Sequence, residues 1–235
     1  GSELGVGILG TRADLGAVTG LDTSADGNLL YFSAQIDQQV RVLNVSASAI
    51  TVAGTSVAPA NIGLVASGFG EGLSGIVVHP TTGEVYVGDA TPGINKIFKI
   101  STTGTVTPFA GNGAATKDSD SFQGGQALNI PLLQPRGIEL DISNRVVIAD
   151  TGHGRVIRVE ANGTANLVSQ FTITDGLPNP YPVGVSVQGN NTFVVLGNQQ
   201  TIVRLSGGSP VTVAGQTGQS CDYSVSSCGD GGAAT

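Results

Sequence analysis

The sequence predicts an all-β protein built from repeated four-stranded antiparallel sheets. Residues 135–170 hold four apolar runs of strand length, separated by turn-forming residues: Gly137–Asp141, Arg145–Asp150, Arg155–Glu160 and Ala165–Ser169. The pattern recurs along the chain, and one glycine opens each copy: Gly20, Gly75, Gly137 and Gly184. Glycine makes up 36 of the 235 residues, which favours many turns and few helices. One such sheet cannot bury both of its faces, so these repeats predict a β-propeller whose blades cover one another.

Four blades are expected, at about residues 18–54, 74–111, 135–170 and 182–215. Their first strands open at the four glycines. The second strands are predicted at Leu29–Ala34, Glu84–Ala90, Arg145–Asp150 and Thr192–Asn198. The third strands are predicted at Val40–Leu43, Ile97–Ile100, Val156–Val159 and Ile202–Leu205. The fourth strands are predicted at Ile50–Gly54, Val106–Gly111, Ala165–Ser169 and Val211–Gly215.

The residue types in the repeat indicate a family more specifically than the repeat length does. The segments PRGI at 135–138 and ADTGHGRVIRV at 149–159 resemble the NHL-repeat family of β-propellers. The resemblance is strongest in the third blade and looser in the first and fourth, where Leu196-Gly197-Asn198 replaces the family's Ala-Asp-Thr-like turn. It implies a ring of about six blades. Some propellers with similar repeats are lyases that hold zinc through histidines, and some intracellular relatives bind RNA.

Both ends of the chain look like parts of further blades. Residues 5–10 match the closing strand of a preceding blade, and a lone strand leaves unpaired edges. The Gly-rich end of residues 216–235 resembles the link that precedes another repeat. We therefore expect residues 1–235 to form one NHL-like domain of four blades plus one strand, as part of a larger ring. The alternative is a small ring closed by the strands present.

The longest connections are predicted to share one face of the propeller. They join a fourth strand to the next first strand at Thr55–Leu73, Asn112–Leu133, Phe171–Tyr181 and Gln216–Thr235. Because strand direction alternates, the second-to-third turns lie on the same face, here called the long-loop face. Loops of this kind commonly carry binding residues, so protein or glycan partners are expected there.

Sequons and cysteines indicate a secretory environment. Three N-x-[ST] sequons, at Asn44, Asn162 and Asn190, fall in connections of the opposite face, although such tripeptides also arise by chance. Cys221 and Cys228 lie in one polar loop and predict a disulfide, with free thiols or a metal site as the alternatives. Together they favour an extracellular or secreted glycoprotein.

Several classes of function are disfavoured. The chain has two histidines, too few for a three-histidine zinc site, and His79 and His153 are expected at a strand end and in a turn. Oxygen-bearing spacings at Asp22–Asn28 and Asp118–Asp120 do not follow the calcium-loop pattern. The net charge of −7, without a basic cluster, disfavours nucleic acid. No apolar run is long enough to predict a membrane span.

The sequence thus favours an extracellular, non-enzymatic propeller without a cofactor, metal or catalytic residue. Its expected role is protein–protein interaction, adhesion, or a structural matrix or filament module that can self-associate. Two alternatives stay open: a propeller lyase or hydrolase with catalytic residues in further blades, and an RNA-binding NHL module. Fold alone does not decide among them.

Overall fold

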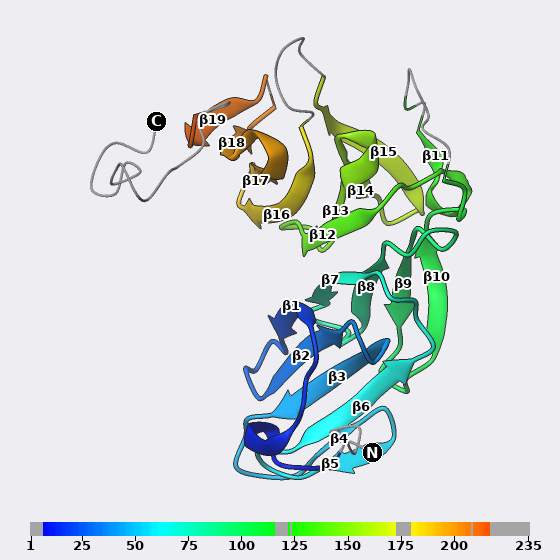
Figure 1. Ribbon diagram of the computed structural model, residues 1–235, viewed down its shortest axis with the longest axis vertical. Helices are drawn as coiled ribbons and strands as arrows, with labels where there is room; N and C mark the ends of the chain where they lie inside the picture. Colours follow the sequence, from blue (N-terminus) through cyan, green and yellow to red (C-terminus); the bar gives the residue numbers. More distant parts are fainter. Residues whose placement is uncertain (1–6, 116–121, 123, 173–179, 208, 217–235) are drawn as a thin grey trace.

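The computed structural model describes residues 7–115, 122, 124–172, 180–207 and 209–216. Four antiparallel sheets stand side by side in an arc, and their innermost strands face a common centre (Figure 1). Within the described residues the helical segments are three-residue turns at Gly10–Arg12, Ala127–Asn129, Thr151–His153 and Gly197–Gln199. The prediction of an all-β propeller with four-stranded blades is confirmed.

Each blade runs from the centre outward. Blade 1 has β1 (Val18–Thr23), β2 (Leu29–Ala34), β3 (Gln39–Asn44) and β6 (Ile62–Ser67). Blade 2 has β7 (Leu73–Val78), β8 (Val85–Asp89), β9 (Lys96–Ile100) and β10 (Val106–Ala110). Blade 3 has β12 (Pro135–Leu140), β13 (Val146–Asp150), β14 (Arg155–Val159) and β15 (Thr164–Gln170), and β11 (Gly125–Gln126) pairs outside β15. Blade 4 has β16 (Pro182–Gln188), β17 (Asn191–Leu196), β18 (Thr201–Leu205) and β19 (Val211–Ala214).

The fourth strand of blade 1 differs from the prediction at Ile50–Gly54. Instead, β4 (Ile50–Val52) and β5 (Thr55–Val57) pair with each other as a hairpin. Ala53 and Gly54 form the turn between them with φ of 48° and 78°, the conformation that two-residue hairpins prefer. The edge of β3 is taken by β6. Blade 1 therefore spans residues 18–67, and its insertion, residues 45–61, lies on the face opposite the long loops.

The N-terminal segment also differs from the prediction that residues 5–10 close a preceding blade. Its described part pairs with blade 1: the amide of Gly7 donates to the carbonyl of Ile62 at 2.6 Å, and the amide of Gly10 donates to Ala60 at 2.8 Å. The segment then crosses β2 and β3 (Figure 1), where Ala13 and Leu15 pack on a small buried cluster. The outward apolar face of blade 1 is thus covered by the chain's own N-terminal segment.

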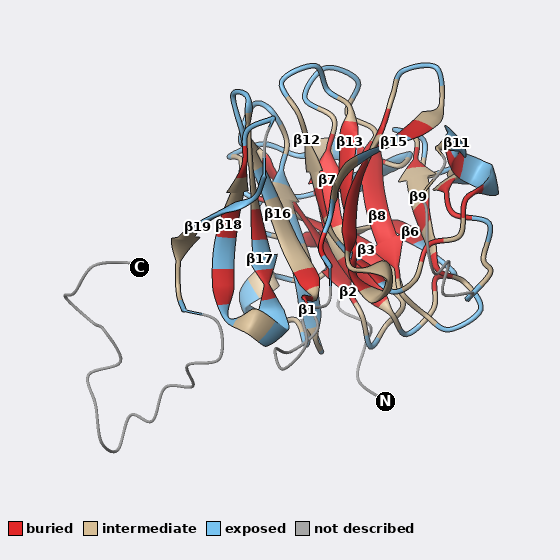
Figure 2. Cartoon of the chain, turned by 90° about the horizontal axis from the view of Figure 1, so that it is seen from above, coloured by how far each residue is buried: buried red, intermediate tan, exposed pale blue. Residues whose placement is uncertain are grey.

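Three apolar cores lie between successive blades. Residues such as Val42 and Val87 form the core between blades 1 and 2, and Ile97 and Ile148 belong to the core between blades 2 and 3. Val156 and Val194 belong to the third. Buried residues accordingly follow the middle of the strands, while the connections at both ends are exposed (Figure 2). Each sheet is stabilised by the neighbour that removes its apolar side chains from water.

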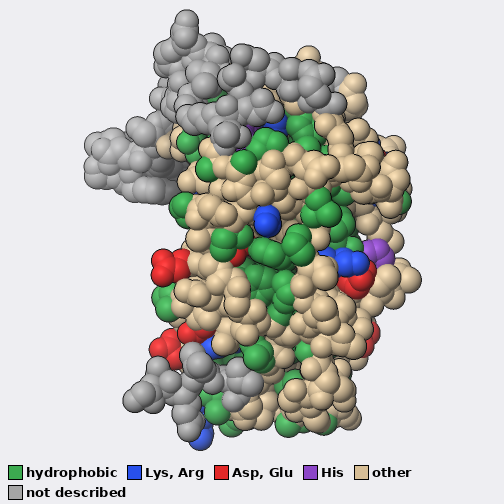
Figure 3. Space-filling view, turned by 90° about the vertical axis from the view of Figure 1, so that its right-hand side faces the viewer, with side chains coloured by type: hydrophobic (Ala, Val, Ile, Leu, Met, Phe, Trp, Pro, Cys, Tyr) green, Lys and Arg blue, Asp and Glu red, His purple; other side chains and the backbone are tan. Residues whose placement is uncertain are grey.

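Among the described residues, no further sheet covers the outward face of blade 4. Val195, Ile202 and Val211 remain 40%, 37% and 49% exposed there. Hydrophobic side chains also reach the surface on the outer side of the arc, where they gather in the middle of the view and charged side chains are sparse (Figure 3). This agrees with the charged content of 11%.

The innermost strands approach one another through the repeated glycines. A β-carbon at Gly20 would lie 2.8 Å from the carbonyl oxygen of Ser74, and one at Gly137 would lie 2.8 Å from the Cα of Gly184. At Gly75 a β-carbon would overlap the carbonyl oxygen of Arg136. Gly184, in the last blade, meets only the Val195 side chain of its own sheet, at 3.5 Å. Glycine is therefore required wherever one blade meets the next.

This difference gives a matched pair of variants. Gly137→Ala is expected to lower the free energy of unfolding by more than about 2 kcal/mol, because the added methyl group meets backbone that cannot move aside. Gly184→Ala makes the same change where only ordinary contacts follow, and we expect an effect within about 0.5 kcal/mol. Urea unfolding of both variants measures the difference, and equal losses would contradict the proposed packing.

Candidate functional site

A depression marks the centre of the long-loop face, where the innermost strands begin. Its volume is about 470 Å³, and its lining includes Thr19, Gln35, Ser74, Gln134, Arg136 and Val183. These residues come from all four blades, so the depression exists only when the blades are assembled. The centre of a ring is a usual place for a binding site because several elements contribute side chains to it.

Arg136 is the one charged residue among the described residues that line this depression. It is exposed on β12, and its guanidinium makes no ion pair or hydrogen bond with a described residue. Gln35 and Gln134 supply amides nearby. An unpaired guanidinium carries five N–H donors in a planar fork, which suits a carboxylate or phosphate.

The segment before Arg136 is fixed by buried polar groups. Asn95, only 1% exposed, accepts the backbone N–H of Gln134 at 2.9 Å, and Asp150, fully buried, accepts that of Leu133 at 2.7 Å. Arg155 pairs with Asp150 at 2.8 Å and donates to the carbonyl of Pro131 at 2.9 Å. The Asp and Arg of the ADTGHGR segment thus act as structural ties that hold the start of β12.

Hydroxyl groups join neighbouring blades around the depression. Ser33 donates to the carbonyl of Ser74 at 2.7 Å, and Ser74 in turn donates to that of Pro135 at 2.8 Å. Thr151 donates to the carbonyl of Pro182 at 2.7 Å. These buried hydrogen bonds fix the relative position of the inner strands, so the depression is preorganised for a ligand.

The other end of the central axis is acidic. Asp22 and Glu139 come from innermost strands of blades 1 and 3 and line an acidic hollow there. Asp22 accepts the backbone N–H of Val78, in blade 2, at 2.7 Å. Burial raises the pKa of Glu139, and the charge of Asp22 raises it further. The axis therefore has a guanidinium at one mouth and two carboxyl groups at the other.

The sequence-predicted site residues are dispersed. His79 accepts the amides of Thr81 and Thr82 at 3.3 and 3.2 Å, and His153 bonds to buried Asp150 at 2.8 Å. Asp26 accepts hydrogen bonds from Ser24 and Asn28 inside a turn. In the described part of the chain no three His, Cys, Asp or Glu residues gather as metal ligands. Cys221, Cys228 and Asp118–Asp120 lie outside the described residues.

Two of the three sequons are accessible. Asn162 and Asn190 are exposed, on the face opposite the long loops. Asn44 is fully buried, and its Nδ2 donates to the carbonyls of Ser48 and Val57, both at 2.8 Å. The folded chain therefore does not present Asn44 to solvent. Sequence reasoning did not single out Arg136, although its place directly before Gly137 on an innermost strand was a usable signal.

No known protein family and no curated protein matches this sequence. Solved structures resemble it in fold, with TM-scores of 0.56 for a streptogramin B lyase and 0.62 for a nidogen/laminin complex. An auxiliary nutrient binding protein from Bacteroides thetaiotaomicron also gives 0.62. Their identities are 16%, 18% and 16%, over 83%, 85% and 93% of this chain. The chain spans 53%, 64% and 49% of theirs, about half the length.

These likenesses show the fold alone and correct one prediction. The sequence favoured a non-enzymatic protein, but propellers that resemble this chain include a lyase. At 16% identity neither an activity nor its absence follows from the fold. Within the described residues, no helix is long and apolar enough to cross a membrane.

The acidic end of the axis predicts an unusual pH dependence. Because burial raises the pKa of Glu139 above its ordinary value of 4.5, its ionised form costs stability in the folded state. Its contribution is fully present below pH 4.5 and is lost as the pH rises through the folded pKa. Glu139→Gln should therefore raise the Tm at pH 7, and the gain should vanish in acid.

Glu160 provides the opposite control. A hydrogen bond from Asn166, with Arg158 and Arg145 beside it, lowers the pKa of Glu160 to about 2. Its contribution is present above pH 4.5 and is lost as the pH falls toward 2. Glu160→Gln should lower the Tm at pH 7. Thermal unfolding between pH 3 and pH 7 checks both variants, and shifts of the same sign at neutral pH would refute this electrostatic account.

Proposed function

We propose that this chain is part of an extracellular NHL-like propeller that binds a protein partner on its long-loop face. Arg136 anchors the partner by pairing with one of its carboxylate groups. The observation that carries the proposal is the guanidinium of Arg136 at the centre of this face, which pairs with none of the described residues and lies in a depression whose other described lining residues are uncharged.

Charge favours a specific contact over general attraction. The chain carries a net charge of −7, so an acidic partner is not drawn to the protein as a whole. The preorganised guanidinium can still bind one carboxylate with two parallel hydrogen bonds. The likeness to the propeller of a nidogen/laminin complex supports binding of a protein. The apolar outward face of blade 4 supports further blades beside it.

The secretory setting is part of the proposal. Glycans at Asn162 and Asn190 would extend from the face opposite Arg136 and leave its depression free. When the protein is secreted from a eukaryotic host, peptide mapping after glycosidase treatment should find sugar at one or both of these residues. Asn44 should be unmodified in the folded protein, because a glycan there displaces the buried bonds to Ser48 and Val57. Sugar at Asn44 in the folded protein would contradict this assignment.

Binding can be measured with two immobilised peptides that differ only in one residue, Asp against Asn, within a neutral sequence. The protein should prefer the Asp peptide, and Arg136→Gln should weaken its binding about 10- to 100-fold, the range for hydrogen bonds to a charged group. Arg136→Lys should lose part of the affinity, since a single ammonium cannot form the bidentate pair.

The control is Arg12→Gln, which removes the same charge from an exposed position outside the depression. It should leave the preference for the Asp peptide unchanged. Equal weakening by Arg12→Gln and Arg136→Gln would mean that only overall charge matters, and the proposed anchor would be wrong. An identical response to the Asp and Asn peptides would reject it as well.

A further inference from the structure

A second pocket lies on the opposite face, at the junction of blades 1 and 2. The insertion 45–61 of blade 1 forms one wall of it through β4 and the turn residue Ala53. The third-to-fourth connections of the other blades are much shorter, at residues 101–105, 160–163 and 206–210. The wall is held by the two hydrogen bonds from Asn44 and by contact between its turn and the Ser101–Thr105 turn, where a β-carbon at Gly104 would lie 3.1 Å from Ala53.

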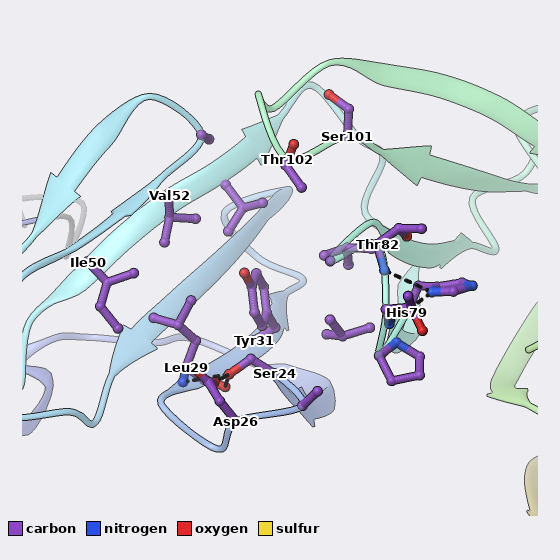
Figure 4. A pocket seen from close by; sticks show the side chains of 18 of the residues that line it. Ser24, Asp26, Leu29, Tyr31, Ile50, Val52, His79, Thr82, Ser101 and Thr102 are labelled. Carbon is purple, nitrogen blue, oxygen red and sulfur yellow. Dashed lines mark hydrogen bonds between the residues drawn. The ribbon is translucent and has the colours of Figure 1, made fainter.

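The pocket combines an apolar floor with a polar rim. Its volume is about 390 Å³, within the range that small-molecule sites occupy. Leu29, Ile50, Val52, Val65, Val78 and Val85 contribute aliphatic side chains. Ser24 and Asp26 of blade 1 and Thr82, Ser101 and Thr102 of blade 2 stand around it (Figure 4). A compact apolar molecule can therefore bury its surface against this floor, away from water, while a polar group of the molecule stays close to the rim.

One polar side chain of the pocket, Tyr31, has a hydroxyl that is available to a ligand. Tyr31 is only 7% exposed, lines the pocket, and stands between the strands of blade 1 and the His79–Thr82 loop (Figure 4). Its hydroxyl makes no hydrogen bond with any described residue. Burial, and to a lesser extent the charge of Asp26, raises the pKa of Tyr31, so the hydroxyl stays protonated and can donate. The hydroxyl is not one of the buried polar atoms that lack a partner, so water can hydrate it, and the oxygen of an entering ligand can take the place of that water.

The charges around the pocket favour a neutral occupant. None of the described residues that line it is Lys or Arg, and Asp26 is its one carboxylate. Hydrogen bonds from Ser24 and Asn28 lower the pKa of Asp26 and keep it ionised. His79 uses Nδ1 to accept the Thr81 and Thr82 amides, and its ring points away from Tyr31 (Figure 4). An anion therefore finds no counter-charge and meets a fixed negative group at the mouth.

We propose that this pocket binds a small uncharged molecule with a compact apolar body and one oxygen that accepts a hydrogen bond from Tyr31. The aliphatic floor holds the body, and the Tyr31 hydroxyl orients it. The site lies on the other face from Arg136, so it is independent of the partner-binding role proposed above.

Cyclohexanone is a suitable probe because it has a compact ring and one carbonyl oxygen. Titration into isotope-labelled protein should shift the methyl NMR signals of Val52, Val65 and Val85 in a saturable manner. Tyr31→Phe removes only the hydroxyl and should weaken binding about three- to tenfold, the effect of one neutral hydrogen bond. Methylcyclohexane should bind Tyr31→Phe and the parent protein equally, and cyclohexanecarboxylate should bind more weakly than cyclohexanone.

A variant at the mouth distinguishes binding inside this pocket from non-specific binding to the protein surface. Ala25 lines the pocket and is exposed, so Ala25→Trp should block entry without disturbing the core. Ala47→Trp adds the same side chain at an exposed position of the insertion outside the pocket, and should bind as the parent does. Binding that survives Ala25→Trp, no saturable shifts at the solubility limit of the probe, or equal binding of the carboxylate would each overturn the proposal.

Discussion

The close approach of innermost strands, possible only at glycine, is the constraint on which the rest of this structure depends. Where Gly75 meets blade 3, the atom that a β-carbon would overlap is the carbonyl oxygen of Arg136. The contact that packs two blades therefore also fixes the residue whose side chain enters the central depression. The same approach brings the Ser33 and Ser74 hydroxyls within 2.7 and 2.8 Å of carbonyls in the next blade. The packing of the blades, the hydrogen bonds of these buried hydroxyls and the position of Arg136 in the depression therefore all depend on the close approach of the inner strands.

Much of the fold could be predicted because the turns and strands of blades 2 to 4 are encoded locally. Blade 1 shows the limit. The segments Ile50–Gly54 and Val211–Gly215 read ITVAG and VTVAG, yet the first is an arm of a hairpin and the second begins with a fourth strand, β19. The local sequence does not determine this difference. In blade 1, β6 occupies the edge of β3, and the chain after Gly54 turns back to pair with β4.

The candidate sites were harder to predict than the fold. An isolated Arg on a strand resembles an ordinary solvated residue, and Arg136 gains meaning only when four blades surround it. Asp150 was recognised as part of a motif, but its role is to hold the chain before β12. In the sequence, Tyr31 resembles any aromatic residue of a strand. Its place in a pocket depends on the β4–β5 hairpin, which the sequence predicted as a fourth strand. These features depend on which segments meet across blades, and a local pattern does not contain that information.

The two sites differ in how they are attached to the ring, and this difference has a physical consequence. The central depression is lined mostly by the inner strands, so a shift of these strands strains the glycine contacts between blades. The wall of the second pocket is an added hairpin, tied to blade 1 by residues 45–61 and by the bonds of Asn44. Val52 and Val57 of this hairpin belong to the core between blades 1 and 2, so its strands are constrained by that core, whereas the turn at Ala53-Gly54 is not part of a blade. The geometry of the second pocket therefore depends on the packing of an inserted segment, and that of the central depression on the contacts between blades.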